Sequence, residues 1–478
     1  MGHVYDLAVV GAGSAGYAAA RTAAGLGMKV AVIEGGQEVG GLCILRGCMP
    51  TKAMLESAHR NHEIGRAKEF GLKVGRPKPD WKAILRRKDK LITEFATYRR
   101  EQLEGGKFTF FRAQGRWKGP HELALEGVGR KRVPKEIKAK TFLVATGSRT
   151  AKREILGLEE ARYWTSDECL RAGKPVKSLI VLGGRAVALE FAQYYAHLGV
   201  KVTVIQRSER LLPESDPEVG DTLAKVFRDQ GSMVFCGTQI ARVVKKGEMK
   251  KVEFLQNGKK RSVEAEQILQ ALGREPNLDG LGLEKAGVNL GGGKLRTRAT
   301  QQTNVSHIFA AGDVCGPYEV VHLAIQQGEV AAKNAVALVA GKEPRERMDY
   351  RLKLEVIFTS PEVAGVGYSE RECREKGWGI VTASYPFAEH GKSMVMGATE
   401  GFVKLIALKP GGEIVGAEVV GPHASDLIHE PMAVMRYGGT AKEMMEMPHY
   451  HPTLSEIWTY PAEEIFGKIS AGGGKRED

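Results

Sequence analysis

The chain has 478 residues, too many for a single hydrophobic core, so several domains are expected. Its apolar fraction of 42% argues against general disorder, and no apolar run in the sequence is long enough to span a membrane. The formal net charge is +13, but the basic clusters Arg86–Lys88 and Arg130–Arg132 are short and contain no aromatic residues. A solvated basic surface is therefore expected, with no nucleic-acid or membrane partner.

A glycine-rich turn follows the first apolar run. Leu7–Val10 leads into Gly11-Ala12-Gly13-Ser14-Ala15-Gly16 and then into an alanine-rich helical stretch. In such a turn the first glycine makes the bend, the second admits a pyrophosphate, and the third lets helix and strand approach. A second apolar run, Lys29–Ile33, ends at Glu34, which is placed to accept hydrogen bonds from a ribose. A dinucleotide site is predicted, the alternative being a tight turn without a ligand.

Two cysteines follow at a spacing of five, within the run Gly40 to Lys52. The residues between Cys43 and Cys48 leave room for a one-turn loop, and Pro50 at a helix start would place Cys48 at the positive end of the helix dipole. That position favours a thiolate. The alternatives are a structural disulfide or half of a zinc site, but the other four cysteines are scattered singly. A redox-active pair is predicted, and with it a reducing, cytoplasmic compartment.

Further along, helical spacing of apolar residues predicts a core-facing helix over 80–103, inserted in the first domain. Residues 140–148 predict a buried strand ending in a small-residue turn, and 178–190 a second strand-turn-helix like the first. Two such units imply two dinucleotides. The turn Ala310–Asp313, after the strand Ile308–Phe309, would close the first nucleotide domain.

Beyond residue 346 the fingerprints stop, and alternation over 401–406 predicts a separate mixed α+β domain. Within it, His449-Tyr450-His451-Pro452-Thr453-Leu454-Ser455-Glu456 holds a histidine that a carboxylate could poise for proton transfer. Thr453 and Glu456 also match a capping box, and the two roles can coexist. Gly472–Gly474 and the charged residues after them are expected to form a loose tail.

Taken in order along nearly the whole chain, these motifs resemble the pyridine nucleotide-disulfide oxidoreductases of the glutathione reductase and dihydrolipoamide dehydrogenase type. They include the two glycine-rich turns, the cysteine pair, Ala145-Thr146-Gly147, Gly273-Arg274-Glu275-Pro276-Asn277, Ala310-Ala311-Gly312-Asp313 and the segment from His451 to Glu456. The resemblance implies an α/β fold with two Rossmann-like dinucleotide-binding domains and a C-terminal α+β dimerisation domain. FAD would bind to 1–150 and 276–345, NAD(P)H to 151–275, and 346–478 would form the interface of a homodimer.

The resemblance also implies roles for single residues. Cys43 would be the interchange thiol that meets substrate, and Cys48 the thiolate that contacts the flavin. His451, oriented by Glu456, would act on the partner's cysteines. Lys52 and Glu190 would lie beside flavin and nicotinamide, and Asp313 would hold the ribityl chain. The expected FAD site comprises Gly11, Gly13, Ser14, Ala15, Gly16, Glu34, Gly41, Lys52, Thr146, Gly147 and Asp313, and the expected NAD(P) site Gly183, Gly184, Arg185, Gln206, Arg207 and Gly273.

A dihydrolipoamide dehydrogenase-like activity on a small dithiol or a lipoyl-bearing protein is favoured. The tail has no cysteine pair of the kind that mercuric reductases use, and Glu329 stands where glutathione reductases carry an arginine, although Arg21 matches another arginine of the glutathione site. His322 resembles the lipoamide enzymes. The alternatives are a reductase of another small disulfide or metal ion, and a flavin- and dithiol-bearing subunit that exchanges electrons with a partner protein and uses nicotinamide poorly. No structural metal is expected.

Three departures qualify the resemblance. Arg46 adds positive charge inside the redox loop. Arg185 replaces the second glycine of the second turn and is expected to crowd the pyrophosphate. Gln206 stands where NAD-preferring relatives usually carry a carboxylate, and with Arg207, Arg210 and Ala188 it favours NADPH.

Overall fold

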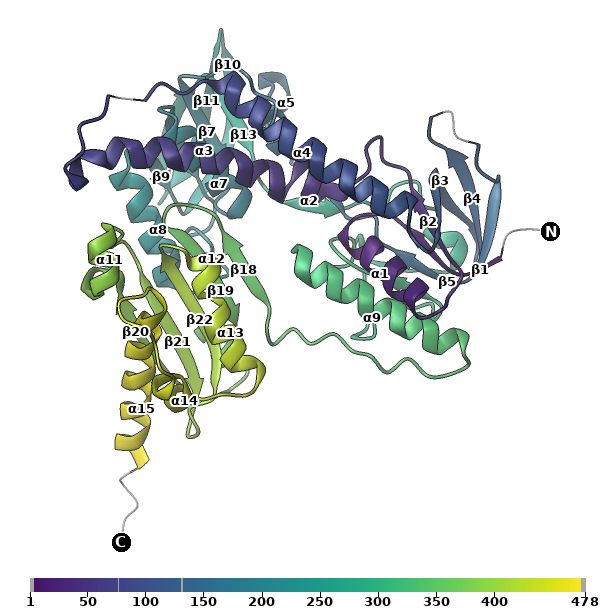
Figure 1. The fold of residues 1–478 in the computed structure, drawn as a ribbon. Coiled ribbons are helices and arrows are strands. Elements are labelled where there is room, and N and C mark those ends of the chain that lie inside the picture. The colour runs from purple at the N-terminus through teal and green to yellow at the C-terminus, as the bar shows by residue number, and fades with distance from the viewer. Residues whose placement is uncertain (1–3, 76, 130–131, 474–478) are drawn as a thin grey trace. The chain divides into compact units, whose positions relative to one another are not determined.

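The computed structural model of the protein describes residues 4–75, 77–129 and 132–473 (Figure 1). Two residues of the second basic cluster, Arg130 and Lys131, and residues 474–478 of the expected tail lie outside this description. Gly472 and Gly473 end a helix, so the expected loose tail does not begin where it was predicted.

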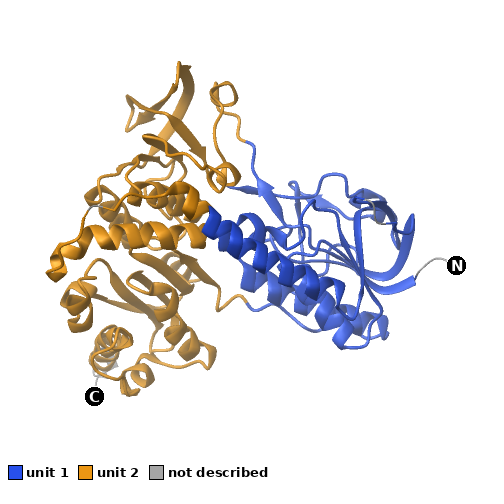
Figure 2. Cartoon of the chain, turned by 45° about the horizontal axis from the view of Figure 1, so that its top comes forward, with its two compact units in different colours: residues 1–50, 86–152, 273–349 blue, residues 51–85, 153–272, 350–478 orange. Residues whose placement is uncertain are grey.

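The chain forms two compact units (Figure 2). Unit 1 comprises residues 1–50, 86–152 and 273–349, and unit 2 comprises residues 51–85, 153–272 and 350–478. The division into two compact units carries no information on which cofactor each segment binds. The division into domains at 150, 275 and 345 therefore stays a prediction.

Unit 1 is built on a mainly parallel sheet. Its strands are β1 (Val4–Val10), β2 (Val30–Glu34), β3 (Thr109–Gly119), β4 (Glu122–Gly127), β5 (Glu136–Val144) and β17 (Ile308–Ala310). The neighbours β3, β2, β1, β5 and β17 run parallel, and β4 joins β3 and β5 in antiparallel pairings. Helix α1 (Ser14–Gly25) packs on α9 (Val321–Val339), because buried alanines and Gly328 let the two backbones approach. This confirms the first strand-turn-helix and the strands over 29–33 and 308–309.

Small elements complete unit 1. They are the antiparallel pair β6 (Ser148–Thr150) with β14 (Arg274–Pro276), the pair β15 (Leu290–Gly291) with β16 (Lys294–Leu295), the 3-10 helix η2 (Leu283–Ala286) and the short helix α2 (Gly41–Arg46).

Unit 2 contains a second parallel sheet, ordered β13-β7-β8-β9. Its strands are β13 (Gln267–Gln270), β7 (Ser178–Leu182), β8 (Lys201–Ile205) and β9 (Met233–Phe235), with helices α7 (Ala186–His197) and α8 (Pro217–Asp229) between them in the chain. Strand β7 is almost completely buried and leads through a turn into α7, so the second predicted strand-turn-helix is confirmed. An antiparallel sheet of β10 (Thr238–Lys246), β11 (Met249–Gln256) and β12 (Lys259–Ala265) follows.

The C-terminal part of unit 2 is an antiparallel sheet with helices, which confirms the predicted α+β character of this segment. It belongs to the same compact unit as residues 153–272, so its separation as a domain stays a prediction. The strand order is β18 (Leu354–Ile357), β19 (Glu362–Gly367), β22 (Ile414–Gly421), β21 (Phe402–Leu408) and β20 (Ile380–Pro386). Helix α15 (Thr459–Gly473) packs on β20 and β21, while α8 and α13 (His429–Arg436) contact β22. Because elements cover both faces, 403–407 are all buried, and the expected alternation over 401–406 is wrong.

Short helices occupy the remaining segments of unit 2. They are η1 (Ala67–Phe70), α5 (Leu158–Ala161), α6 (Ser166–Cys169), α10 (Glu370–Glu375), η3 (Phe387–Glu389), α11 (Gly391–Met396), α12 (Ala424–Leu427), α14 (Ala441–Glu446) and η4 (Ser455–Trp458).

Two long helices extend across the boundaries between the segments of the units: α3 (Cys48–Arg66) and α4 (Trp81–Glu104). The helix predicted over 80–103 is confirmed as α4, but its apolar stripe is buried only at its ends. Trp81 and Leu103 are buried, whereas Phe95 and Tyr98 are 38% and 63% exposed. Residues 81–85 also belong to unit 2, so the helix is not simply an insertion in the first domain. Among the described helices, none combines the length and hydropathy that a membrane crossing requires.

Candidate active site

The first glycine-rich turn is too closely packed for side chains at two positions. Gly11 has φ +103°, and a Cβ there would lie 2.3 Å from the Ala145 carbonyl oxygen. A Cβ on Gly16 would lie 1.9 Å from the carbonyl oxygen of Gly11. Strand and helix therefore meet at backbone contact distance, which is the arrangement that a dinucleotide turn requires.

Gly13 and Gly41 keep open the space before the N-terminus of α1. Gly41 has φ +75°, and a Cβ there would lie 2.7 Å from the Cα of Gly13. A side chain would thus fill the cradle in which a pyrophosphate meets the helix N-terminus. These residues fit the diphosphate of FAD.

Glu34, at the end of β2, is oriented by two backbone groups. Its Oε2 accepts a hydrogen bond from the Ala12 N–H at 2.9 Å, and its Oε1 accepts one from the Gly36 N–H at 2.6 Å. Each carboxylate oxygen has two lone pairs, so both retain capacity for a ribose hydroxyl. The role expected for Glu34 is compatible with this geometry.

Three other residues expected at the flavin, Thr146, Gly147 and Asp313, lie in unit 1. Thr146 donates from its hydroxyl to the Asn277 carbonyl at 2.7 Å, and Gly147 has φ +69°. Ser148 donates to Asp313 Oδ2 at 2.6 Å and accepts from Arg274 Nε at 2.7 Å. The buried Gln327 accepts from the Gly312 N–H at 2.7 Å and so holds the turn before Asp313. The motifs around 146, 273 and 313 are therefore one structural cluster.

The cysteines lie on consecutive helices. Cys48 is the first residue of α3, which confirms the helix start predicted from Pro50. The thiolate that the helix dipole would favour there stays a prediction. The loop expected between the cysteines is wrong: Cys43 lies within α2, and only Gly47 separates the helices. A Cβ on Gly47 would lie 3.0 Å from the Leu42 oxygen and 3.2 Å from the Cα of Cys43, so glycine permits this close turn. Both cysteines are half-buried.

Arg99 was not identified from the sequence, where it is one of many charged residues of α4. Its guanidinium carbon lies 4.1 Å from the centroid of the Tyr17 ring. Its Nε is buried and has no hydrogen-bond partner in the described ranges. Burial lowers the pKa of Arg99, and the ionised forms of Tyr17 and Cys43 oppose that effect. The structure thus adds a cation to the surroundings of the predicted interchange thiol.

Arg21 argues for a glutathione site and Glu329 argues against one, and in the structure these two residues form an ion pair. The Arg21 guanidinium lies 3.5 Å from Glu329 Oε1, and the side chains are 64% and 34% exposed. Helices α1 and α9 carry the two residues. The carboxylate therefore compensates a charge that would otherwise attract an anionic substrate.

Lys52 and Glu190 are brought together although they lie 138 residues apart. The ammonium of Lys52 donates to both carboxylate oxygens of Glu190 at 2.8 Å. The Phe358 N–H also donates to Glu190 Oε1 at 3.1 Å, and Lys52 Nζ lies 4.8 Å from the centroid of the Phe358 ring. The Glu190 side chain is only 4% exposed. A buried carboxylate thus positions the lysine expected beside the flavin.

His451 and Glu456 form the pair expected from the sequence, with His451 Nδ1 3.0 Å from Glu456 Oε2. The His451 side chain is 80% exposed, and Nε2 has no hydrogen-bond partner among the described residues. The expected capping box of Thr453 and Glu456 is wrong, because η4 begins after Leu454 and has no side-chain cap. The carboxylate is directed to the histidine instead.

The second glycine-rich turn resembles the first only in part. Gly183 has φ +127°, and its Cβ would lie 2.5 Å from the Ala271 oxygen. Arg185 caps α7 in an extended conformation with φ −109°, which any residue can adopt. Its guanidinium forms an ion pair with Glu214, with Nε 3.0 Å from each carboxylate oxygen. The Arg185 side chain is 64% exposed.

Gln206 lies at the end of β8, where the first turn has Glu34. It is only 7% exposed, and its Oε1 accepts from the Arg207 N–H at 3.2 Å. A Cβ on Gly184 would lie 2.9 Å from the Gln206 amide carbon, so the amide packs directly on the turn. Arg207 is exposed, and Arg210 is paired with Asp221 at 2.9 Å.

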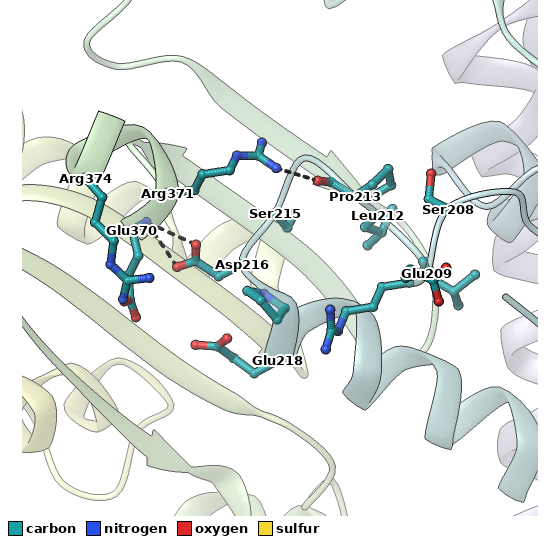
Figure 3. Close-up of a pocket in the computed structure, with 13 residues that line it drawn as sticks. Ser208, Glu209, Leu212, Pro213, Ser215, Asp216, Glu218, Glu370, Arg371 and Arg374 are labelled. Carbon is teal, nitrogen blue, oxygen red and sulfur yellow. Dashed lines mark hydrogen bonds and ion pairs between the residues drawn. The ribbon is translucent and has the colours of Figure 1, made fainter. Parts of the chain in front are cut away.

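A cavity of about 490 Å³ lies beside this turn, between the loop 208–218 and α10 (Figure 3). Carboxylates of Asp216, Glu218 and Glu370 meet there, a grouping that the sequence did not reveal. The ammonium of Lys404 contacts all three, at 2.7 Å for Asp216 and 2.6 Å for Glu370. Burial alone would lower the pKa of Lys404, but these hydrogen bonds outweigh it and the pKa is raised. A lysine therefore occupies the centre of the carboxylate cluster.

The chain is similar to known proteins over most of its length. Residues 5–328 match the family model of pyridine nucleotide-disulphide oxidoreductases, and residues 354–462 match the dimerisation domain of that family. The chain is 36% identical to a dihydrolipoyl dehydrogenase of Thermus scotoductus over 465 residues, covering 96% of this chain and 97% of the relative. It is 33% identical to a mercuric reductase of Bacillus cereus, covering 95% of this chain and 70% of that one.

The fold is similar to that of a Cu(II) complex of the HOCl-induced flavoprotein disulfide reductase RclA from Escherichia coli. The TM-score is 0.84 at 23% sequence identity, covering 97% of this chain and all of the other. At this identity the likeness concerns the fold.

Proposed function

Because the chain belongs to the pyridine nucleotide-disulphide oxidoreductase family, and so works with FAD and NAD(P)H, we propose that it oxidises a small dithiol of the dihydrolipoyl type. The observation that carries this choice of substrate is the ion pair of Arg21 with Glu329. Glutathione disulfide is anionic, and Glu329 both repels it and neutralises Arg21. A lipoyl group carries no such carboxylates near its sulfurs. The naming of full-length relatives as dihydrolipoyl dehydrogenases supports the same choice.

In the proposed mechanism His451 takes a proton from the substrate dithiol through Nε2, while Glu456 at Nδ1 stabilises the imidazolium that forms. The substrate thiolate attacks the sulfur of Cys43, the bond between Cys43 and Cys48 breaks, and Cys48 leaves as thiolate. The N-terminus of α3 stabilises that negative charge. The second substrate thiol then attacks the substrate sulfur of this mixed disulfide, its proton passes to the departing sulfur of Cys43, and the substrate leaves as its disulfide. FAD, when bound, carries the two electrons on to the pyridine nucleotide. The family resemblance implies that His451 acts across a homodimer.

The two cysteines form a matched pair of variants for testing these roles. Two-electron reduction of wild-type enzyme is expected to produce a long-wavelength thiolate-to-flavin absorbance band. Cys43→Ser should keep this band and Cys48→Ser should lose it. A Cys48→Ser protein that retains the band would contradict the assignment.

Substitution of His451 tests the acid-base role. His451→Gln is expected to slow dithiol turnover by about 100- to 10,000-fold without loss of flavin. The exposed His429→Gln is the control and should turn over like wild type. Turnover of His451→Gln within a few-fold of wild type would remove His451 from the mechanism.

The substrate itself is tested by comparing kcat/KM for dihydrolipoamide, glutathione disulfide, other small disulfides, mercuric ion and a thioredoxin-like protein. Dihydrolipoamide is expected to be the best of these. In Glu329→Ala the turnover of glutathione disulfide should rise, because Arg21 is released. A wild-type preference for glutathione disulfide would overturn the proposal.

A second candidate function is electron exchange with a partner protein by a subunit that uses nicotinamide poorly. The replacement of the second turn's glycine and carboxylate by Arg185 and Gln206 favours it. Stopped-flow reduction of the flavin by NADH and NADPH distinguishes the two. Fast reduction by either coenzyme supports the dehydrogenase, and slow reduction by both supports the second candidate.

A further inference from the structure

The carboxylate of Glu456 contacts a second histidine that no sequence motif marked. Oε2 faces His451, and Oε1 lies 3.3 Å from Nε2 of His390. His390 lies in the turn between η3 and α11, 61 residues before His451. Its side chain is completely buried, whereas His451 is 80% exposed. One carboxylate therefore joins a buried imidazole to an exposed one.

The surroundings of His390 decide which ring nitrogen carries the proton. Nδ1 lies 2.9 Å from the hydroxyl of the buried Ser393, and the edge of the ring meets Tyr460 at a centroid distance of 6.3 Å. Burial lowers the pKa of His390, and the charge of Glu456 opposes that effect only in part, so the ring is neutral near pH 7. A bare Nε2 facing a carboxylate oxygen would be repulsive. The proton therefore belongs on Nε2, with Ser393 donating to Nδ1.

We propose that His390 is a positioning residue for the acid-base pair, contacting Oε1 of Glu456 and sharing the charge of its carboxylate. This inference rests on the proposed role of His451. The groups that face His390 are Glu456 from η4, His451 beyond it, and Tyr460 from α15. Among these groups only Glu456 carries a full negative charge. A donor at Oε1 withdraws charge from Oε2 and weakens the hold of the carboxylate on the His451 proton.

A neighbouring pair supplies a structural control. His449 Nε2 lies 2.6 Å from Glu430 Oε1, and its Nδ1 lies 2.9 Å from the Met447 oxygen. This is a mostly buried histidine bonded to a carboxylate, close in sequence to His451. Its carboxylate belongs to Glu430 and not to Glu456, so the same substitution there removes a similar contact without touching the acid-base pair.

The test is the pH dependence of kcat/KM for dihydrolipoamide between pH 5.5 and 9, measured on folded, FAD-loaded enzyme. In His390→Leu the midpoint of the rise should move to higher pH by about half to one pH unit, as expected for the loss of one close polar contact to the carboxylate. His390→Gln, whose amide nitrogen reaches the position of Nε2, should restore most of the shift. His449→Gln should leave the midpoint unchanged.

Two further measurements keep the outcomes distinct. Ser393→Ala should move the midpoint in the same direction by less, and it serves if His390→Leu does not fold. The rate of Cys43 alkylation by iodoacetamide in the NAD(P)H-reduced enzyme should show the same pH shift, whatever the physiological substrate is. An unmoved midpoint in folded His390→Leu and in Ser393→Ala overturns the inference alone. A fully active His451→Gln overturns the proposed acid-base role, and with it the basis of the inference.

Discussion

The two nucleotide-binding turns share one sequence design but differ in packing. In unit 1 a Cβ on Gly16 would lie 1.9 Å from the Gly11 oxygen, so the third glycine is required. In unit 2 the corresponding residue is Ala188, whose methyl is completely buried without displacing the turn. The comparison shows that a glycine motif constrains the chain only where two backbones meet at contact distance.

The residues that end the next strand after each turn also differ between the two units. Glu34 directs both carboxylate oxygens to backbone N–H groups at 2.9 and 2.6 Å. Gln206, its counterpart, is a buried amide packed on Gly184. The first turn thus retains the charge that binds a ribose, and the second has lost the charge that repels a 2′-phosphate.

The largest expected effect is from Gly16→Ala. The added methyl must push α1 away from β1, since it would meet backbone rather than a flexible side chain. Bound flavin should fall by at least about tenfold, a cost of about 1.4 kcal/mol or more. The absorbance ratio at 450 and 280 nm after purification measures it. The matched change in the second turn, Ala188→Gly, should leave flavin content unchanged, and full flavin in Gly16→Ala would break the comparison.

The next effect concerns coenzyme preference. Wild type is expected to prefer NADPH, and Gln206→Glu should lower the ratio of kcat/KM for NADPH over NADH by about tenfold, because a carboxylate repels the 2′-phosphate. Steady-state kinetics with both coenzymes measure the ratio. Gln206→Met, of similar size and uncharged, is the control. A wild-type preference for NADH would show that Arg207 and Arg210 point only to solvent.

A smaller effect on stability is expected from the network that anchors the second turn. Leu212 donates to the Gly184 oxygen at 3.0 Å, and the same loop ends at Asp216, held by Lys404. Beside them, burial and then the charge of Asp216 raise the pKa of Glu418 from 4.5 to about 8. The unfolded carboxyl loses its proton near pH 4.5 and the folded one near pH 8, so its stabilising contribution is lost as pH rises through this window.

In the variant Glu418→Gln the new side chain is neutral at every pH, so the variant does not lose this stabilising contribution as pH rises. Its free energy of unfolding should exceed that of wild type by about 1 kcal/mol at pH 8, raising Tm by a few degrees, with little difference at pH 5. Thermal unfolding at both pH values is the measurement. The exposed Glu413→Gln, in the same hairpin, should change neither. Equal Tm differences at pH 5 and pH 8 would contradict the proposed protonation.

The smallest effect is expected from Arg185→Gly. Removing the side chain should tighten NAD(P)H binding by about two- to fivefold and speed flavin reduction, because the second position of such a turn lies against the pyrophosphate. The guanidinium is engaged by Glu214, so its loss should cost little charge compensation. Glu214→Gln, which releases the guanidinium, sharpens the test. Weaker coenzyme binding in folded Arg185→Gly would show that the arginine contributes to phosphate binding.

Several parts of the fold were predictable because their causes are local. Both glycine turns, the strands before them and the start of α3 at Cys48 depend on residues within a few positions of each other. The pair of His451 and Glu456 lies within one such segment. Local reasoning failed where a second partner competed, as when Glu456 served His451 and His390 rather than a helix cap.

The sequence by itself determined the two nucleotide turns, the cysteine pair and the family to which the chain belongs, since spacing along the backbone imposes them. Only the tertiary structure decided which distant side chains meet. It brought Glu190 to Lys52, Glu329 to Arg21, and His390 to Glu456. It also buried Lys404 among three carboxylates. For the buried groups Glu190 and Lys404 the physical reason is that a buried charge must find a partner wherever packing places one, and no local pattern in the chain records that choice.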